Sequence, residues 1–124
     1  MDTPKNIMVA DDDMSILDVV GSMLEFAGYT VTHSNTAELV LSNPKLPDLF
    51  LLDIWINGTD GREICRQLKQ NTTTKDIPVI LFSASWGIEQ SAREAGADDF
   101  LAKPFHMTDL LEKIEGLLSR SFPA

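Results

Sequence analysis

Short, almost uninterrupted runs of apolar residues recur along the chain and alternate with segments whose apolar residues fall at helical spacing. Uninterrupted apolar runs are typical of strands buried on both faces of a parallel sheet. The clearest run, at 49–53, lies between Pro47-Asp48 and Asn57-Gly58 and stops on the carboxylate of Asp53. On this pattern we predict five strands, at 6–10, 29–33, 49–53, 77–82 and 99–102.

The segments that follow these runs carry the helical pattern. Within 15–27 the apolar residues fall largely on one helical face, the polar residues fall on the other, and Gly28 provides a natural stop. We predict helices at about 15–27, 36–42, 62–69, 88–95 and 108–118, of which 88–95 has the weakest pattern. The segment 57–61, Asn-Gly-Thr-Asp-Gly, is predicted to be a loop with residues at positive φ.

Strand and helix thus alternate five times without a repeat or a change of composition. Because crossovers between parallel strands are right-handed, such a chain forms a parallel sheet with helices on both faces. We therefore predict an α/β fold with a five-stranded parallel sheet. At 124 residues the chain is expected to form a single domain over 1–124.

Composition narrows the class of protein. The single cysteine, Cys65, excludes an internal disulfide and favours a reducing compartment. No apolar run approaches the roughly 20 residues of a membrane span, so we expect a cytoplasmic protein without a membrane contact. Nineteen acidic residues against ten Lys and Arg give a net charge of −9, which argues against nucleic-acid binding and favours cations and basic partners.

Polar residues that could take part in binding or catalysis follow the predicted strands. The carboxyl ends of parallel strands meet at one edge of the sheet, where ligands bind in open α/β folds. The residues that reach this edge are Asp11, Asp12, Asp13, Asp53, Ser83 and Lys103.

Each of these residues also has an ordinary interpretation, as a turn aspartate, an exposed acidic loop, a strand-end hydroxyl or a surface lysine. Asp13 is expected to be solvated and to start the first helix. Together, however, the carboxylates can hold Mg²⁺, while Ser83 and Lys103 can bind phosphate oxygens. Asp53, at the centre, can attack phosphorus as a nucleophile. Neighbouring carboxylates repel one another without a cation, so the site is expected to destabilise the metal-free protein.

Five segments give the chain a specific resemblance over nearly its whole length. They are Val9-Ala10-Asp11-Asp12-Asp13, Leu51-Leu52-Asp53 with Gly61 after it, Phe82-Ser83-Ala84, Ala95-Gly96-Ala97-Asp98-Asp99-Phe100 and Lys103-Pro104-Phe105. With these segments the chain resembles the receiver domain of two-component response regulators. The resemblance implies a flavodoxin-like, doubly wound (βα)5 fold with strand order 2-1-3-4-5.

The resemblance also implies a role for each site residue. Asp53 accepts a phosphoryl group from the phosphohistidine of a sensor histidine kinase or a phosphotransfer protein. Mg²⁺, with Mn²⁺ as a substitute, is held by Asp12, Asp53 and the backbone carbonyl of Trp55, and Asp11 acts mainly through water. Ser83 and Lys103 bind the phosphoryl oxygens, and Phe100 swings inward when Ser83 moves.

Further expectations follow from the same resemblance. The Lys103-Pro104 peptide bond is expected to be cis. The domain is not a turnover enzyme, but catalyses its own phosphorylation and a slow dephosphorylation. The phosphorylated state is read on the face formed by the fourth helix, the fifth strand and the last helix. The domain binds no nucleic acid or membrane itself, and its downstream effector is unspecified.

Three departures from the family pattern stand out. Asn57 replaces the proline that usually lies four residues after the phosphorylated aspartate, which is expected to make the loop more mobile. Trp55 is bulkier than is usual at its position. The interval from Ser83 to Lys103 is about two residues short, roughly half a helical turn, and the shortening falls on the fourth helix.

Two other functions compete with a phosphorylation switch. A metal-dependent phosphohydrolase with an aspartyl intermediate usually carries a second acid two residues after its nucleophile, where this chain has Trp55. A pseudo-receiver typically lacks one of the site residues, whereas this chain has them all. A free single-domain regulator and a part of a longer protein are equally consistent with the sequence.

Overall fold

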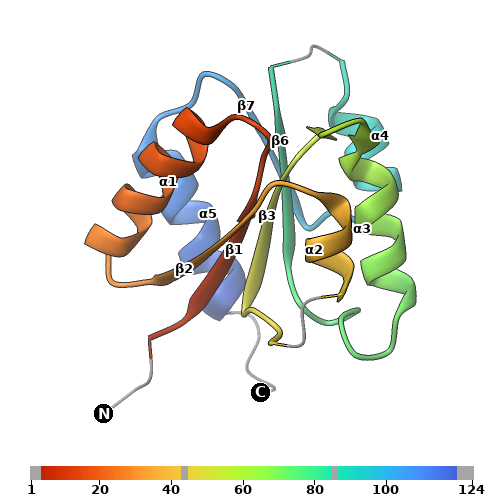
Figure 1. The fold of residues 1–124 in the computed structure, drawn as a ribbon, viewed down its shortest axis with the longest axis horizontal. Coiled ribbons are helices and arrows are strands. Elements are labelled where there is room, and N and C mark those ends of the chain that lie inside the picture. Colours follow the sequence, from red (N-terminus) through yellow and green to blue (C-terminus); the bar gives the residue numbers. More distant parts are fainter. Residues whose placement is uncertain (1–3, 43–44, 85–86, 120–124) are drawn as a thin grey trace.

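A five-stranded parallel sheet forms the centre of the computed structural model, which describes residues 4–42, 45–84 and 87–119 (Figure 1). Its strands are β1 (Asn6–Ala10), β2 (Thr30–Ser34), β3 (Leu49–Asp53), β6 (Val79–Ser83) and β7 (Asp99–Ala102). They lie in the order β2-β1-β3-β6-β7, all parallel. The predicted α/β fold and the 2-1-3-4-5 order are confirmed, with β6 and β7 as the fourth and fifth strands of the sheet.

Helices cover both faces of the sheet. They are α1 (Met14–Phe26), α2 (Ala37–Ser42), α3 (Gly61–Gln70), α4 (Glu89–Glu94) and α5 (Met107–Ser119). Helices α1 and α5 lie on one face, and α2, α3 and α4 lie on the other (Figure 1). None of the helices within these described ranges is long and apolar enough to cross a membrane.

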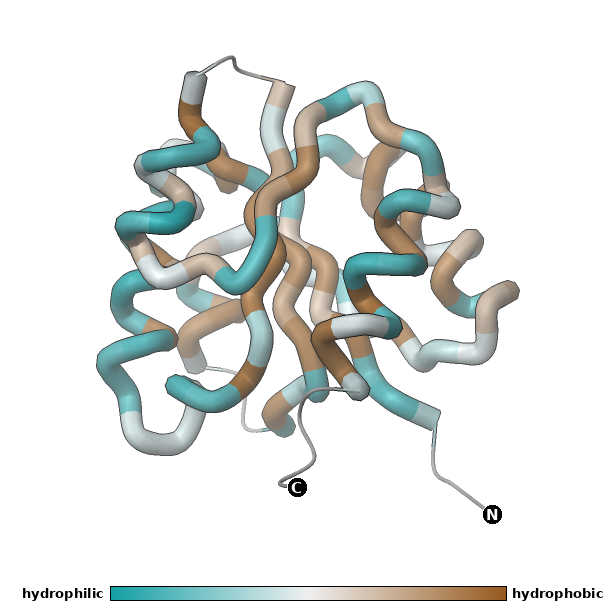
Figure 2. The backbone as a smooth tube through the Cα atoms, turned by 180° about the vertical axis from the view of Figure 1, so that it is seen from behind, coloured by the Kyte–Doolittle hydropathy of each residue, from teal (hydrophilic) through white to brown (hydrophobic). Residues whose placement is uncertain are grey.

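Alternating side chains of the central strands build two cores. In β1, Ile7 and Val9 pack beneath α1 and α5, whereas Met8 and Ala10 pack beneath α2 and α3. All four residues are fully buried, as are Leu49–Leu52 of β3. This burial on both faces explains the uninterrupted apolar runs, and Figure 2 shows the central strands as mainly hydrophobic, between helices that mix hydrophilic and hydrophobic residues.

Two strands begin later than predicted for identifiable reasons, and each also ends one residue later than predicted, β2 at Ser34 and β6 at Ser83. Helix α1 ends in a Schellman motif, in which the Tyr29 amide donates to the Leu24 carbonyl and Gly28 has φ of +103°. Tyr29 therefore belongs to the helix stop, and β2 begins one residue later. β6 begins at Val79 because Pro78 has no amide hydrogen for the ladder; only its carbonyl pairs, accepting from the Phe50 amide.

An ionic clamp holds the amino-terminal edge of the sheet, opposite the edge that carries the predicted site. The Lys69 ammonium donates to Asp98 Oδ2 at 2.8 Å and to the Ile77 carbonyl at 3.0 Å. The same carboxylate oxygen accepts from the Val79 amide at 2.8 Å. The clamp therefore joins α3, the start of β6 and the loop before β7.

The segment predicted to be a loop after Asp53 contains a short hairpin. Strand β4 (Trp55–Ile56) pairs antiparallel with β5 (Thr59–Asp60), and only Asn57 and Gly58 lie in the turn. The prediction of positive φ was right, at +48° for Asn57 and +87° for Gly58. The prediction of a loop over 57–61 was wrong for its last three residues, because Asn-Gly favours a two-residue type I′ hairpin turn, so that β5 takes up 59–60 and α3 begins at Gly61.

Candidate functional site

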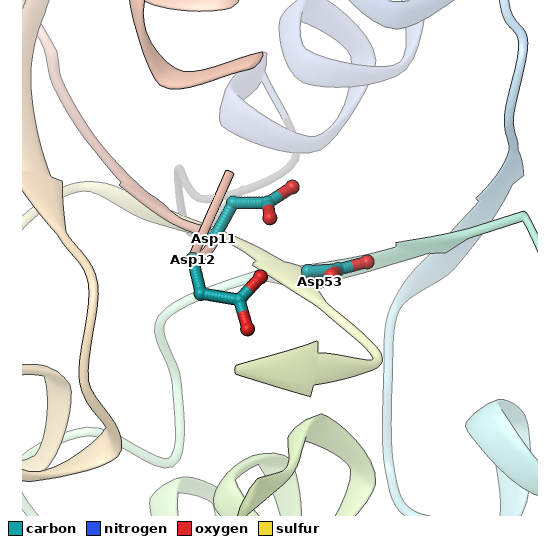
Figure 3. A group of neighbouring side chains, drawn as sticks. All are labelled: Asp11, Asp12 and Asp53. Carbon is teal, nitrogen blue, oxygen red and sulfur yellow. The ribbon is translucent and has the colours of Figure 1, made fainter. Parts of the chain in front are cut away.

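Three aspartates meet at the carboxyl-terminal edge of the sheet. Asp11 and Asp12 follow β1, and Asp53 ends the neighbouring strand β3 (Figure 3). Each residue offers one carboxylate oxygen, and these oxygens lie within 4.8 Å of one another. Asp11 is completely buried, Asp53 is partly buried and Asp12 is exposed, so the group opens from the interior towards solvent.

Lys103 lies against two of these carboxylates. Its ammonium is 3.0 Å from Asp11 Oδ2 and 3.3 Å from Asp53 Oδ1, and it lies 4.5 Å from the centre of the Phe82 ring. The Lys103-Pro104 peptide bond is cis, as the resemblance implied. The Lys103 amide also donates to the Ser83 carbonyl at 2.8 Å, which joins β7 to the end of β6. The lysine is thus held in the site by both its main chain and its side chain.

The surroundings of Asp53 weaken its acidity. Burial and the nearby Asp11 carboxylate raise the pKa of Asp53 to about 6, although the Lys103 ammonium and the hydrogen bond from the Ile54 amide act in the opposite direction. A carboxyl group with this pKa is still mostly ionised above pH 7. At neutral pH the Asp53 carboxylate therefore carries a negative charge that its neighbours compensate only in part.

The pairing of β4 with β5 determines the direction in which the Trp55 carbonyl oxygen points. The Gly61 amide donates to the Ile54 carbonyl at 2.6 Å, and Ile56 pairs with Thr59 next to the turn. Trp55 and Asp60 lie between these positions as a pair that is not hydrogen-bonded, because antiparallel ladders alternate the two kinds of pair. The Trp55 carbonyl consequently points away from the partner strand, and the Trp55 side chain is 55% exposed.

Gly61 allows the main chain to pass close to Asp53. A Cβ atom at residue 61 would overlap the Asp53 carbonyl oxygen and lie 3.1 Å from the Ile54 Cα. Only glycine fits here without movement of the strand that carries Asp53. This close approach gives a physical reason for glycine at position 61, eight residues after Asp53.

The other predicted residues lie around this cluster. Ser83 is buried at the end of β6, one position beyond Phe82, the residue that pairs with Asp53. Phe100 lies in β7 and packs with the core beneath α3 and α4, so it is outside the cluster. Asp13 caps α1 as expected, accepting from the Ser15 amide at 2.9 Å.

Two residues that contact the site were not identified as such from the sequence. Phe82 forms an apolar wall against the Lys103 ammonium, and the apolar run of β6 carries no signal of that contact. Asn57 was predicted to lie in a loop and was noted as a departure from the family pattern, but its contact with the site was not predicted: its amide donates to Asp12 Oδ2 at 2.9 Å. The Asn-Gly dipeptide is a recognised hairpin signal and could have placed this amide in a turn beside the site.

The site offers the oxygen ligands that a hard divalent cation requires. Carboxylate and carbonyl oxygens are the ligands that Mg²⁺ prefers, and Mg²⁺ usually keeps several waters, so an open site with few protein ligands fits it. The ammonium of Lys103 adds a positive charge that can pair with phosphate oxygens. This set of groups suits phosphoryl chemistry better than chemistry on a neutral substrate.

Comparison with known protein families points to one family. The sequence model of the response regulator receiver domain matches residues 7–115. The phosphate regulon transcriptional regulatory protein PhoB of Pseudomonas aeruginosa is 36% identical over 124 residues, which cover 96% of this chain and 54% of PhoB. The chain spans about half the length of the curated relatives it matches.

Solved structures agree with this sequence similarity. A CheY-like receiver domain protein from Methanospirillum hungatei JF-1 is 32% identical with a TM-score of 0.87, and the match covers 96% of this chain and 97% of that one. The receiver domain of a sensor histidine kinase from Pseudomonas aeruginosa PAO1 has the same fold, with a TM-score of 0.87 at 23% identity and coverage of 94% and 99%. That domain has a magnesium ion coordinated in its active-site cleft.

Proposed function

This chain belongs to the receiver domain family of two-component response regulators, and on that basis we propose that Asp53 is its phosphoryl acceptor. Receiver domains act as phosphorylation switches. The observation that carries the assignment is the Asp53 carboxylate at the edge of the sheet, grouped with those of Asp11 and Asp12 and 3.3 Å from the Lys103 ammonium. We propose that the receiver domain occupies the whole chain, 1–124.

We assign the other site residues to two tasks. Asp12, Asp53 and the Trp55 carbonyl bind Mg²⁺, or Mn²⁺ in its place, while the buried Asp11 acts mainly through water. The outward direction of the Trp55 carbonyl supports its place in this set. When bound, the ion would neutralise charge on the phosphoryl group. Ser83 and Lys103 bind the phosphoryl oxygens.

The transfer itself needs an ionised Asp53. One of its carboxylate oxygens attacks phosphorus, a bond from oxygen to phosphorus forms, the bond from phosphorus to the histidine nitrogen breaks, and the imidazole leaves with that electron pair. Lys103 is already adjacent to the attacking carboxylate, so its charge is in place before the reaction begins. The domain therefore catalyses its own phosphorylation, followed by slow hydrolysis, without turning over a substrate.

The proposed donor is a sensor histidine kinase or a phosphotransfer protein. Its histidine must reach Asp53, so its surface has to cover the rim of the site. Beside Lys103 lies an apolar groove of about 500 Å³, lined by Ile16 and Val19 of α1 and by Pro104 and Phe105. A donor helix with an apolar face fits this groove, because exposed apolar surface next to a reactive site is typical of an interaction surface.

We propose that phosphorylation is read on the face formed by α4, β7 and α5. Ser83 and Phe100 connect the site to this face: Ser83 pairs with Ala102 and Phe100 with Leu81 across the β6–β7 ladder. With its charge of −9 the domain is not expected to bind nucleic acid or a membrane itself. We propose a cytoplasmic location, and the effector that reads this face is unspecified.

Incubation with acetyl phosphate tests the assignment directly. We expect intact-mass spectrometry to find one added phosphoryl group in the presence of Mg²⁺, and none in EDTA or in Asp53→Asn. Lys103→Ala should retain metal binding while phosphorylation or its response is impaired, because the ammonium contacts phosphate rather than metal. A mass increase that persists in Asp53→Asn would move the acceptor to another residue.

A further inference from the structure

The turn between β4 and β5 has a conformation that proline cannot adopt. Asn57 has φ of +48° and Gly58 has φ of +87°, both in the left-handed region, as a type I′ turn requires. Proline is restricted to φ near −65° and has no amide hydrogen. Asn57 therefore gives this chain a turn of a different kind from the one that a proline at the same position would form.

The amide of this turn contacts the opposite side of the site. The Asn57 N–H donates to Asp12 Oδ2 at 2.9 Å, across 45 residues of sequence. In a type I′ turn the bonds that close the hairpin join the flanking residues, here Ile56 and Thr59. The Asn57 amide is therefore free of the ladder and is directed out of the hairpin, towards the loop after β1.

This contact occupies only one oxygen of the Asp12 carboxylate. Carboxylates that bind metals are commonly oriented by hydrogen bonds to their second oxygen, and loss of such a partner typically lowers metal affinity about 10–100-fold. Asp12 is the exposed member of the three aspartates, so it has more freedom to rotate than the buried Asp11. A fixed donor is consequently most useful at Asp12.

We propose that Asn57 is a positioning residue of the metal site. Its main-chain amide orients the Asp12 carboxylate, and the Asn57-Gly58 turn thereby couples metal binding to formation of the β4–β5 hairpin. The inference rests on the proposed function, because it takes Asp12 as a metal ligand. It also gives a structural consequence to the replacement of the usual proline by Asn57, because the Asn57 amide makes a contact with the site that proline could not make.

A single-atom replacement tests the role of the amide. In a semisynthetic protein, glycolic acid at position 57 replaces the amide N–H by an ester oxygen, and the matched control is Asn57→Gly, which keeps the N–H and the left-handed turn. We expect Asn57→Gly to bind Mg²⁺ within about twofold of the wild type, and the ester to bind at least about tenfold more weakly. Mg²⁺ affinity is measured from the metal-dependent rise in melting temperature and from amide resonances.

A second measurement needs no metal and no semisynthesis. In the metal-free protein, Asp12→Ala removes the acceptor, so the Asn57 amide proton resonance should move upfield. The inference would be overturned if the ester and its glycine control bound Mg²⁺ with equal affinity. It would also be overturned if the Asn57 amide proton had the same chemical shift in Asp12→Ala as in the wild type. A wild-type protein that does not respond to Mg²⁺ would instead overturn the proposed function, while the Asn57 resonance would still report whether the contact exists.

Discussion

Asp53 and Lys103 show how a few side chains set the electrostatics of the site at the scale of single residues. Sequence reasoning expected repulsion among Asp11, Asp12 and Asp53. The structure divides this group, because the Lys103 ammonium contacts Asp11 and Asp53, whereas Asp12 is exposed and accepts from the Asn57 amide. Asp53 nevertheless keeps an unfavourable charge, because its burial and, secondarily, the Asp11 carboxylate raise its pKa to about 6.

This raised pKa predicts how the stability of the metal-free protein depends on pH. The folded state holds a proton on Asp53 more tightly than the unfolded state, where the pKa is about 3.8. The resulting contribution is fully present below pH 4 and is lost as the pH rises through 6. Because the side chain is partly open to solvent, we expect a loss of about 1 kcal/mol, or a few degrees in melting temperature.

Asp53→Asn isolates this contribution, because asparagine does not titrate. We expect the variant to melt a few degrees above the wild type at pH 7.5 and to lose that advantage at pH 4. The measurement is the difference between the two melting temperatures as a function of pH without metal. A difference that stays constant from pH 4 to 7.5 would show that Asp53 has an ordinary pKa.

Gly61 gives a second prediction at the residue scale. Alanine at this position would force the hairpin away from Asp53, so we expect a loss of about 2 kcal/mol of unfolding free energy, together with slower phosphorylation by acetyl phosphate. Gly116→Ala in α5 is the matched control, because nothing lies within 4 Å of the added Cβ and alanine favours a helix. Urea denaturation of both variants would decide the matter. Equal stability of Gly61→Ala and the wild type would contradict the close approach.

Helix α4 depends on its neighbours at the scale of elements. It has only six residues, and Ile88 at its amino-terminal cap makes no side-chain capping bond. Arg62, at the start of α3, contacts Asp60 with two nitrogens and donates to Ser91 Oγ of α4 at 2.9 Å. The arginine therefore joins the end of the β4–β5 hairpin to a helix of the proposed output face.

We predict that Arg62→Lys loosens α4, because lysine cannot make these contacts at the same time. Hydrogen exchange should show less protection of the α4 amides, with a loss of about 1 kcal/mol in the free energy of local opening. Arg93→Lys on the same helix is the control, since Arg93 pairs with Glu89 at the surface, where ion pairs contribute little. Unchanged exchange in Arg62→Lys would show that packing alone holds α4.

Most of the molecule could be predicted from the sequence at the scale of the whole fold. Buried parallel strands give uninterrupted apolar runs, so the runs ending at Ala10 and Asp53 located β1 and β3 at their observed bounds. The meeting of Asp11, Asp12 and Asp53 then followed from the rule that parallel strands end at one edge.

What could not be predicted depends on contacts between distant segments. The Asn57 amide meets Asp12 only after the hairpin and the loop after β1 are placed in space, and the Phe82 ring meets Lys103 only across two strands. Helix lengths were close to those observed, but the contact that holds α4 is made by Arg62 from another element. Such pairings leave no periodic pattern in the sequence, because the partners come from segments that are far apart along the chain.

The Lys69 clamp separates the structural anchor of the sheet from the edge that carries the proposed site. At the amino-terminal edge, Lys69 and Asp98 tie α3, β6 and the loop before β7 together through one carboxylate and one ammonium. At the opposite edge, the proposed role of Lys103 requires its ammonium to exchange a carboxylate partner for a phosphoryl oxygen. Strand register is thus anchored away from the proposed chemistry, so we expect sequence changes in the loops around Asp53 to leave the frame of the sheet undisturbed.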